Sequence, residues 1–173
     1  MHRTFELNVG DEALQSFRSR LRGRLIRPDD EGYDAARSIW NGMVNKYPAL
    51  IVRSAGVSDV IESVNFAREN GIQLSIRGGG HNIAGNAISD GGLVIDLSVM
   101  KSIRVDPAAR TARAEPGLTW AEFDLETQAF GLATTGGVVG TTGIAGLTLG
   151  GGVGWLHAKY GLTVDNLLSA DVV

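Results

Sequence analysis

The distribution of its 24 glycines constrains this chain more than any other feature. Nine of them fall in the 19 residues from Gly136 to Gly154, and three more are consecutive in the segment RGGGH at residues 77–81. Glycine accepts positive φ angles and leaves the backbone bare, so such clusters indicate a backbone that must approach another group closely. The chain is therefore predicted to present two ordered glycine-rich loops.

Composition sets the broad class of protein. The 173 residues fit one domain or slightly more, with 43% hydrophobic residues, 20% charged residues and a net charge of −3. These values are average for globular proteins, and they argue against a disordered chain and against a generally basic nucleic-acid-binding surface. Composition alone indicates no partner.

Several classes of site are excluded or disfavoured by residue type. The chain has no cysteine, which excludes disulfides, thiolate metal sites, iron–sulfur clusters and thiol nucleophiles. His2, His81 and His157 are far apart in sequence, so no metal site is predicted. No apolar run approaches 18 residues and the polar start lacks a signal-peptide core. We therefore expect no membrane association and a cytoplasmic location.

Residues 1–47 are predicted to hold one helix and an irregular connection. Leu14, Phe17 and Leu21 recur at spacings of three and four within residues 11–22, as on one face of a helix. Residues 27–47 show no clean period and are interpreted as irregular. The regular domain is expected to begin near Pro48.

Residues 48–173 predict an α+β domain of mixed strands and helices. Thr119 and Glu122 form a capping-box signature for a helix over 120–130, which ends at Gly131. The other expected elements are strands at 49–54, 72–76 and 93–98, a helix at 58–70, a hairpin of 102–105 with 111–115, and a final apolar strand within 165–173. Because that strand stops as if in mid-element, the domain is predicted to be incomplete at its C-terminal end.

The segment RGGGH follows a predicted strand directly. Its consecutive N–H groups can converge on one anion, and Arg77 is expected to add positive charge. A tight loop without a ligand explains the glycines equally well, and both interpretations stay open on this segment alone. The chain has no GK pair and no G-x-G-x-x-G, so Walker A and Rossmann loops are disfavoured.

The longer segment RGGGHNIAG resembles the FAD pyrophosphate loop of the p-cresol methylhydroxylase-type domain in the vanillyl-alcohol oxidase superfamily. Residues 48–81 and 94–106 are similar to the segments that flank this loop in the family. Residues 140–173 resemble the second flavin-contacting loop of the berberine bridge enzyme-like branch. The resemblance covers residues 48–173.

This resemblance implies an FAD-linked oxidase or dehydrogenase. A small organic substrate would give hydride to the flavin, and oxygen or another acceptor would reoxidise it. In the family, a second domain supplies the substrate pocket and catalytic base, so we assign no catalytic residue here and expect residues 1–173 alone to be inactive. The state of oligomerisation, including a homo-oligomer, is left open. The alternative function is a non-catalytic nucleotide- or phosphate-binding module.

The resemblance also implies the contacts with FAD. His81 matches the histidine that attaches covalently to the flavin; its alternative role is a hydrogen bond within a turn. Thr141, Thr142 and Gly143 are the first choices for contact in the second loop. The full predicted set adds Arg77, Gly78, Gly79, Gly80, Asn82, Gly85, Val139, Gly146, Gly150 and Gly151.

The second loop differs from that of the family's bicovalent members, in which a cysteine forms a second bond to the flavin beside the histidine bond. Val139 stands where they carry a cysteine, and Ala145-Gly146-Leu147 replaces their GGH triplet. Single attachment through His81 is therefore expected. The Val, Ile, Leu and Thr residues within 136–154 predict an ordered, buried loop rather than a flexible linker. His157, beside Trp155, is expected to lie in a packing or surface segment and is assigned no functional role.

Overall fold

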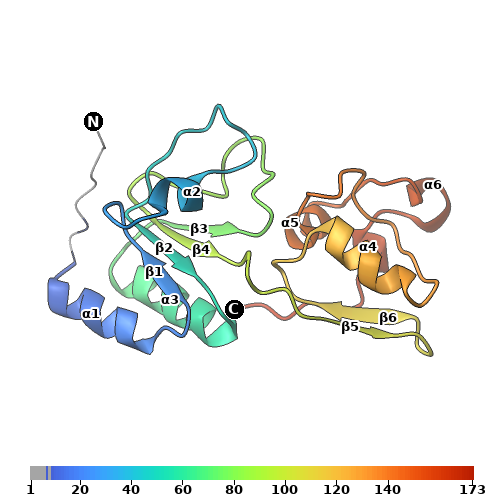
Figure 1. Cartoon of the computed structure of the whole chain (residues 1–173), viewed down its shortest axis with the longest axis horizontal. Coiled ribbons are helices and arrows are strands. Elements are labelled where there is room, and N and C mark those ends of the chain that lie inside the picture. The colour runs from blue at the N-terminus through green and yellow to red at the C-terminus, as the bar shows by residue number, and fades with distance from the viewer. Residues whose placement is uncertain (1–6, 8) are drawn as a thin grey trace. The chain divides into compact units, whose positions relative to one another are not determined.

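A computed structural model describes residue 7 and residues 9–173 of the chain. The described residues form two compact units (Figure 1). The first extends to Val99 and includes Val173, and the second comprises residues 100–172. Among the described residues, no helix is long and apolar enough to cross a membrane.

The first unit is built on a four-stranded sheet in the order β1-β2-β4-β3. β2, β4 and β3 are parallel, and β1 pairs antiparallel with β2 at the edge. Their runs of Leu, Ile and Val suit a sheet that is covered on both faces. The strands are β1 (Arg24–Ile26), β2 (Leu50–Arg53), β3 (Leu74–Arg77) and β4 (Leu93–Asp96).

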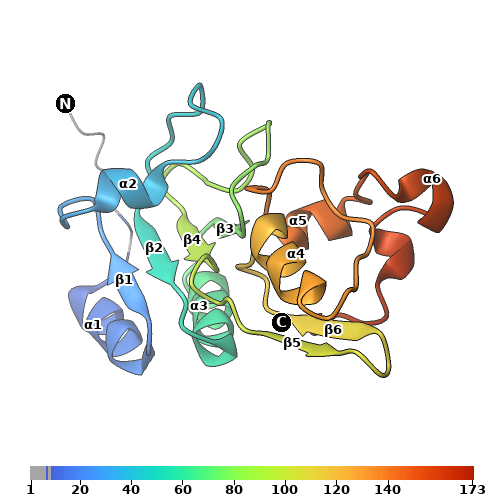
Figure 2. The same ribbon diagram turned by 45° about the vertical axis from the view of Figure 1, so that its right-hand side comes forward.

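Helices cover this sheet. α1 (Asp11–Arg20) and α3 (Val57–Glu69) lie side by side (Figures 1 and 2). Between them, the ring of Phe17 stacks on that of Phe66 with centroids 4.0 Å apart. α2 (Tyr33–Arg37) adds Tyr33 and Ala36 to a separate buried cluster with strand residues. That cluster also contains Ile26, Ile51, Ile88 and Val94.

Residues 27–47 are more regular than their sequence predicts. They contain α2, and β1 immediately before them extends the sheet by one strand. Both elements are too short to show a period, at five and three residues, and their packing against the sheet fixes them. The start of the family-type domain at residue 48 stays a prediction.

The second unit carries a hairpin and four short helical elements. In Figure 2, α4 (Trp120–Gln128) lies over the hairpin of β5 (Ile103–Asp106) and β6 (Thr111–Ala114). The predicted capping box is confirmed, since Thr119 and Glu122 bond reciprocally at the start of α4. The remaining elements are α5 (Ile144–Leu149), α6 (His157–Tyr160) and a 3-10 turn (Val164–Asn166).

The final strand predicted within residues 165–173 is wrong. After the turn that ends at Asn166 the chain has no regular structure, and within the described residues no strand pairs with it. An apolar run forms a strand only when a neighbour completes its backbone hydrogen bonds.

Candidate functional site

Three charged residues lie side by side at the C-terminal ends of the parallel strands. The RGGGH loop begins at this edge of the sheet. Arg53 on β2, Asp96 on β4 and Arg77 on β3 are paired in register. The loop from residue 78 therefore leaves the carboxyl edge of the sheet. Ligands of open parallel sheets bind outside this edge.

Asp96 is fully buried between the two arginines. Its Oδ2 lies 2.5 Å from Arg77 Nη2 and 3.1 Å from Arg53 Nε. Burial by itself would raise the pKa of Asp96, but the charge of Arg77 and the hydrogen bonds from Arg77 and Ser98 hold it below its ordinary value. The carboxylate is therefore charged in the folded protein.

Arg77 differs from the expectation that it would add positive charge to the glycine loop. Its guanidinium is buried, is paired with Asp96, and also donates to the carbonyls of Ala36 and Ser38. One carboxylate shared with Arg53 does not cancel both positive charges, but the donors of Arg77 are engaged within the protein, and its direct contact with a cofactor stays a prediction. Arg77 instead joins the sheet to the last turn of α2 and to Ser38 directly after it.

The glycines after Arg77 have a backbone suited to an anion. Gly80 has a φ of 70°, which lies in the left-handed region that favours glycine. Within the described residues, none of the N–H groups of Gly78, Gly79 and Gly80 is used by a backbone carbonyl, which suits the backbone of an anion-binding nest.

His81 is half-buried and stacks on Trp40. The two ring centroids are 5.1 Å apart and the planes are inclined by 20°. The backbone N–H of Trp40 also donates to the carbonyl of Gly80 at 3.1 Å. Sequence reasoning assigned no role to Trp40, because nothing local relates it to a loop 40 residues later.

Gly85 is packed tightly at the far end of this loop. A Cβ added there would lie 2.8 Å from Val44 Cγ1, and the φ of Gly85 is +73°. We expect Gly85→Ala to lower the free energy of unfolding by roughly 1–3 kcal/mol through strain and overpacking. Urea denaturation measures the change.

Gly42→Ala is the matched control for this substitution. Gly42 lies in the same unit, has no neighbouring heavy atom within 4 Å of an added Cβ, and lacks a positive φ. Its alanine variant should be as stable as the parent protein or slightly more stable. Equal stabilities for the two variants would show that the Gly85 contact is unimportant.

The second loop is held against the start of α4. Thr142 accepts a hydrogen bond from Trp120 N–H at 3.0 Å, and Gly143 pairs with Thr119 in an antiparallel bridge. Thr141 and Val139 are exposed. The structure therefore fixes the backbone of residues 140–144, while their contact with a cofactor stays a prediction.

Many glycines of this loop are explained by contacts within the protein. A Cβ on Gly154 would fall 1.6 Å from the carbonyl oxygen of Gly136, and one on Gly136 would fall 2.5 Å from Trp120 Cε3. By contrast, an added Cβ at Gly146 would meet no described heavy atom within 4 Å. Of the predicted contact glycines, Gly150 ends α5 and Gly151 has a φ of +106°.

The loop is less buried than predicted. Ile144 is buried and Leu147 packs beside it in the cluster with Leu118 and Trp120, but Leu149 is 69% exposed. Residues 144 and 147 share one face of α5, and 149 lies on another. Val138, Val139 and Val153 are also exposed.

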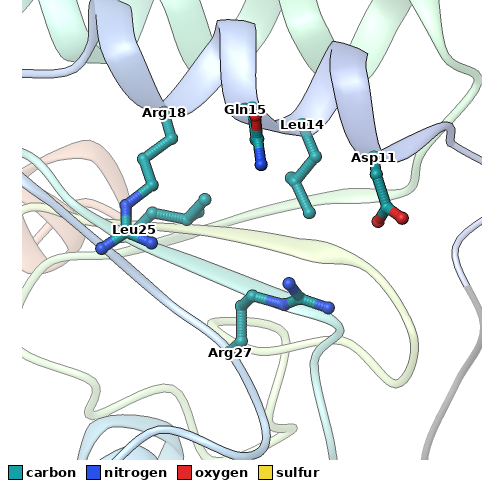
Figure 3. A pocket seen from close by; sticks show the side chains of 6 residues that line it. All are labelled: Asp11, Leu14, Gln15, Arg18, Leu25 and Arg27. Atoms are coloured by element: carbon teal, nitrogen blue, oxygen red, sulfur yellow. The ribbon is translucent and has the colours of Figure 1, made fainter.

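Two other features lie outside the predicted set. His157 is exposed, and its Nδ1 lies 2.6 Å from the carbonyl oxygen of Gly154. In the part of the chain that the structure describes, which omits His2, no group of three or more His, Cys, Asp or Glu residues could hold a metal ion. The pocket in Figure 3 contains no predicted cofactor contact; it is lined by Asp11, Leu14, Gln15, Arg18, Leu25 and Arg27.

Comparison with known proteins identifies the family. A family model described as an FAD binding domain matches residues 48–173. The chain belongs to this FAD-binding domain family. The resemblance to the p-cresol methylhydroxylase-type domain of berberine bridge enzyme-like oxidoreductases is thereby confirmed, together with the mixed α+β fold.

Three known proteins show how similar this FAD-binding domain is to its relatives. (R)-6-hydroxynicotine oxidase of Paenarthrobacter nicotinovorans is 44% identical over 153 residues, which are 88% of this chain and 33% of the relative. The structure of BBE-like 1 of Physcomitrella patens is 31% identical with a TM-score of 0.83, covering 90% of this chain and 34% of that protein.

The structure of Phl p 4, a grass pollen allergen with glucose dehydrogenase activity, is 27% identical with a TM-score of 0.81 and covers 88% of this chain and 34% of that protein. The chain therefore spans about a third of the length of these FAD-linked relatives.

The residues of this FAD-binding domain fit the cofactor that the family binds. The pyrophosphate of FAD is an anion, and Gly78, Gly79 and Gly80 offer N–H donors that no described backbone carbonyl uses. Thr141 is exposed in the second loop, and an added Cβ at Gly146 would meet no described heavy atom within 4 Å; the contact of both residues with the cofactor stays a prediction.

Proposed function

We propose that this chain binds FAD covalently through His81 and forms the cofactor-binding part of an oxidoreductase that accepts hydride from a small organic substrate. One observation carries the proposal. Within the family-matched region, His81 follows three glycines whose N–H groups remain available at the carboxyl edge of the sheet. A single attachment is proposed because the chain has no cysteine.

When bound, FAD supplies an electrophilic carbon at its 8α position and a hydride acceptor at N5. The chain's own groups then have distinct tasks. Gly78, Gly79 and Gly80 would donate N–H groups to the pyrophosphate. His81 would bond through the lone pair of one imidazole nitrogen, and the ring would lose the proton carried by its other nitrogen. Thr141, Thr142 and Gly143 are proposed to stabilise negative charge on the ring.

The relatives' names support the kind of substrate. One relative is an oxidase of 6-hydroxynicotine and another has glucose dehydrogenase activity, so both proteins oxidise small organic molecules. We propose the same reaction class here. Because the relatives are about three times longer, the substrate pocket and the base that removes the substrate proton are assigned to residues outside this chain. Residues 1–173 alone are accordingly expected to show no turnover.

Anaerobic spectroscopy of the full-length protein tests this function. We expect the oxidised-flavin absorbance to disappear when a substrate is added and to return when oxygen or another acceptor is admitted. Amines such as 6-hydroxynicotine and sugars such as glucose form the first panel. A colourless protein that releases a nucleotide on denaturation would instead support a non-catalytic binding module.

A further inference from the structure

The segment 38–46, here called the backing segment, lies along the loop that carries His81. Trp40 N–H donates to Gly80 O at 3.1 Å, and Asn41 Nδ2 donates to Ile83 O at 2.9 Å. Lys46 Nζ donates to the carbonyls of Gly85 at 2.8 Å and Ile88 at 3.0 Å. The whole segment precedes the family-matched residues 48–173.

The side chain of Trp40 contributes to this contact in a different way. It is 63% exposed, so most of its indole surface gains nothing from burial. Its ring nevertheless stacks on the imidazole of His81, with ring centroids 5.1 Å apart and ring planes inclined by 20°. Such a stack fixes the plane of the imidazole, which has only two side-chain torsions to restrain.

Trp40 therefore constrains both the backbone and the ring at the attachment residue. Its N–H holds the residue immediately before His81, and its indole holds the imidazole. The two constraints act on the position of the reacting nitrogen. A misplacement of about 1 Å can cost a reaction about 100-fold in rate.

We propose that Trp40 is a positioning residue for the attachment of FAD to His81, an inference that rests on the function proposed above. The net reaction joins an imidazole nitrogen to the 8α carbon and removes one hydrogen from the imidazole ring and one from the 8α methyl group. Dioxygen takes up these two hydrogens and becomes hydrogen peroxide. Trp40 does not exchange atoms; it holds the imidazole in the orientation that the new bond requires.

The test follows attachment separately from binding. Full-length protein produced without riboflavin is mixed with excess FAD in air, and the fraction of covalent adduct is measured over time by intact mass after denaturation. We expect Trp40→Ala to slow attachment roughly tenfold or more at saturating FAD, with non-covalent FAD binding retained. Trp40→Phe should restore most of the rate, because a phenyl ring can still stack.

Met43→Ala is the control within the backing segment. Met43 is 93% exposed, and its variant should attach FAD at the parent rate. If Trp40→Ala fails to fold, Trp40→Leu keeps the apolar bulk without an aromatic face and should still be slow.

Two failures can be separated. Parent-like rates in both Trp40→Ala and Trp40→Leu, in protein that does form an adduct on His81, would overturn the role of Trp40 and leave the proposed function standing. Equally slow attachment in Trp40→Phe would also overturn it, since stacking would not be the cause. No adduct in the parent protein would overturn the proposed attachment itself.

Discussion

His81→Ala is expected to abolish the covalent bond to FAD while the domain remains folded. Every other contact of the glycine loop is retained in this variant, including the hydrogen bond from Trp40 N–H to Gly80 O. His81 is half-buried and lies outside the hydrophobic clusters, so its loss should change the free energy of unfolding by about 1 kcal/mol. Acid precipitation should then leave all of the flavin in the supernatant.

His157→Ala is the control for this result. His157 is exposed in α6, in the second unit, and no cofactor contact is assigned to it. Its variant should keep the flavin in the acid pellet, as the parent protein does. Flavin that stays in the pellet with His81→Ala would place the covalent bond at another residue.

Asp96→Asn is expected to cause the largest loss of stability, roughly 3–5 kcal/mol. The carboxylate of Asp96 is 0% exposed and accepts hydrogen bonds from Arg77 and Arg53. Its neutral replacement would leave the buried guanidinium of Arg77 without a counter-charge. Urea denaturation of the variant and parent protein gives the difference directly.

Glu62→Gln provides a matched removal of one carboxylate. Glu62 pairs with Arg20 at 2.7 Å where both side chains are substantially exposed, so this variant should lose at most about 1 kcal/mol. Similar losses in the two variants would contradict the special role of the buried pair.

The buried ion pair of Asp96 and Arg77 also predicts that the stability of the protein depends on pH. The pKa of Asp96 lies below its ordinary value of 3.8 in the folded protein, because Arg77 outweighs the effect of burial. The unfolded chain therefore takes up the proton first, and the stabilisation is fully present above the ordinary pKa. It should be lost as the pH falls through the folded-state value, and Asp96→Asn should lack this part of the acid transition in a pH series of urea denaturation curves.

Much of the regular structure could be predicted because its signals are local. The helix after Thr119 follows from a capping box within four residues, and it is present with both hydrogen bonds. The strands at 50–53 and 93–96 are continuous apolar runs, which is the pattern of buried parallel strands. The glycine loop is recognisable from its own three consecutive glycines directly after a short strand.

The contacts that arrange the loop could not be predicted in the same way. Arg77 was expected beside phosphates, yet it pairs with Asp96 and with carbonyls about 40 residues earlier. Trp40 meets His81 only through the fold, and the local sequence pattern predicts no more than an irregular connection around it. Glycine counts likewise do not distinguish Gly154, which packs on Gly136, from Gly146, which faces open space.

Mass spectrometry of the denatured full-length protein is the most direct test of covalent FAD binding at His81. The parent protein should exceed the mass of its polypeptide by one FAD less two hydrogens, and digestion should place the whole addition on the peptide that contains His81. A mass equal to that of the unmodified polypeptide, in protein that was yellow before denaturation, would contradict the account.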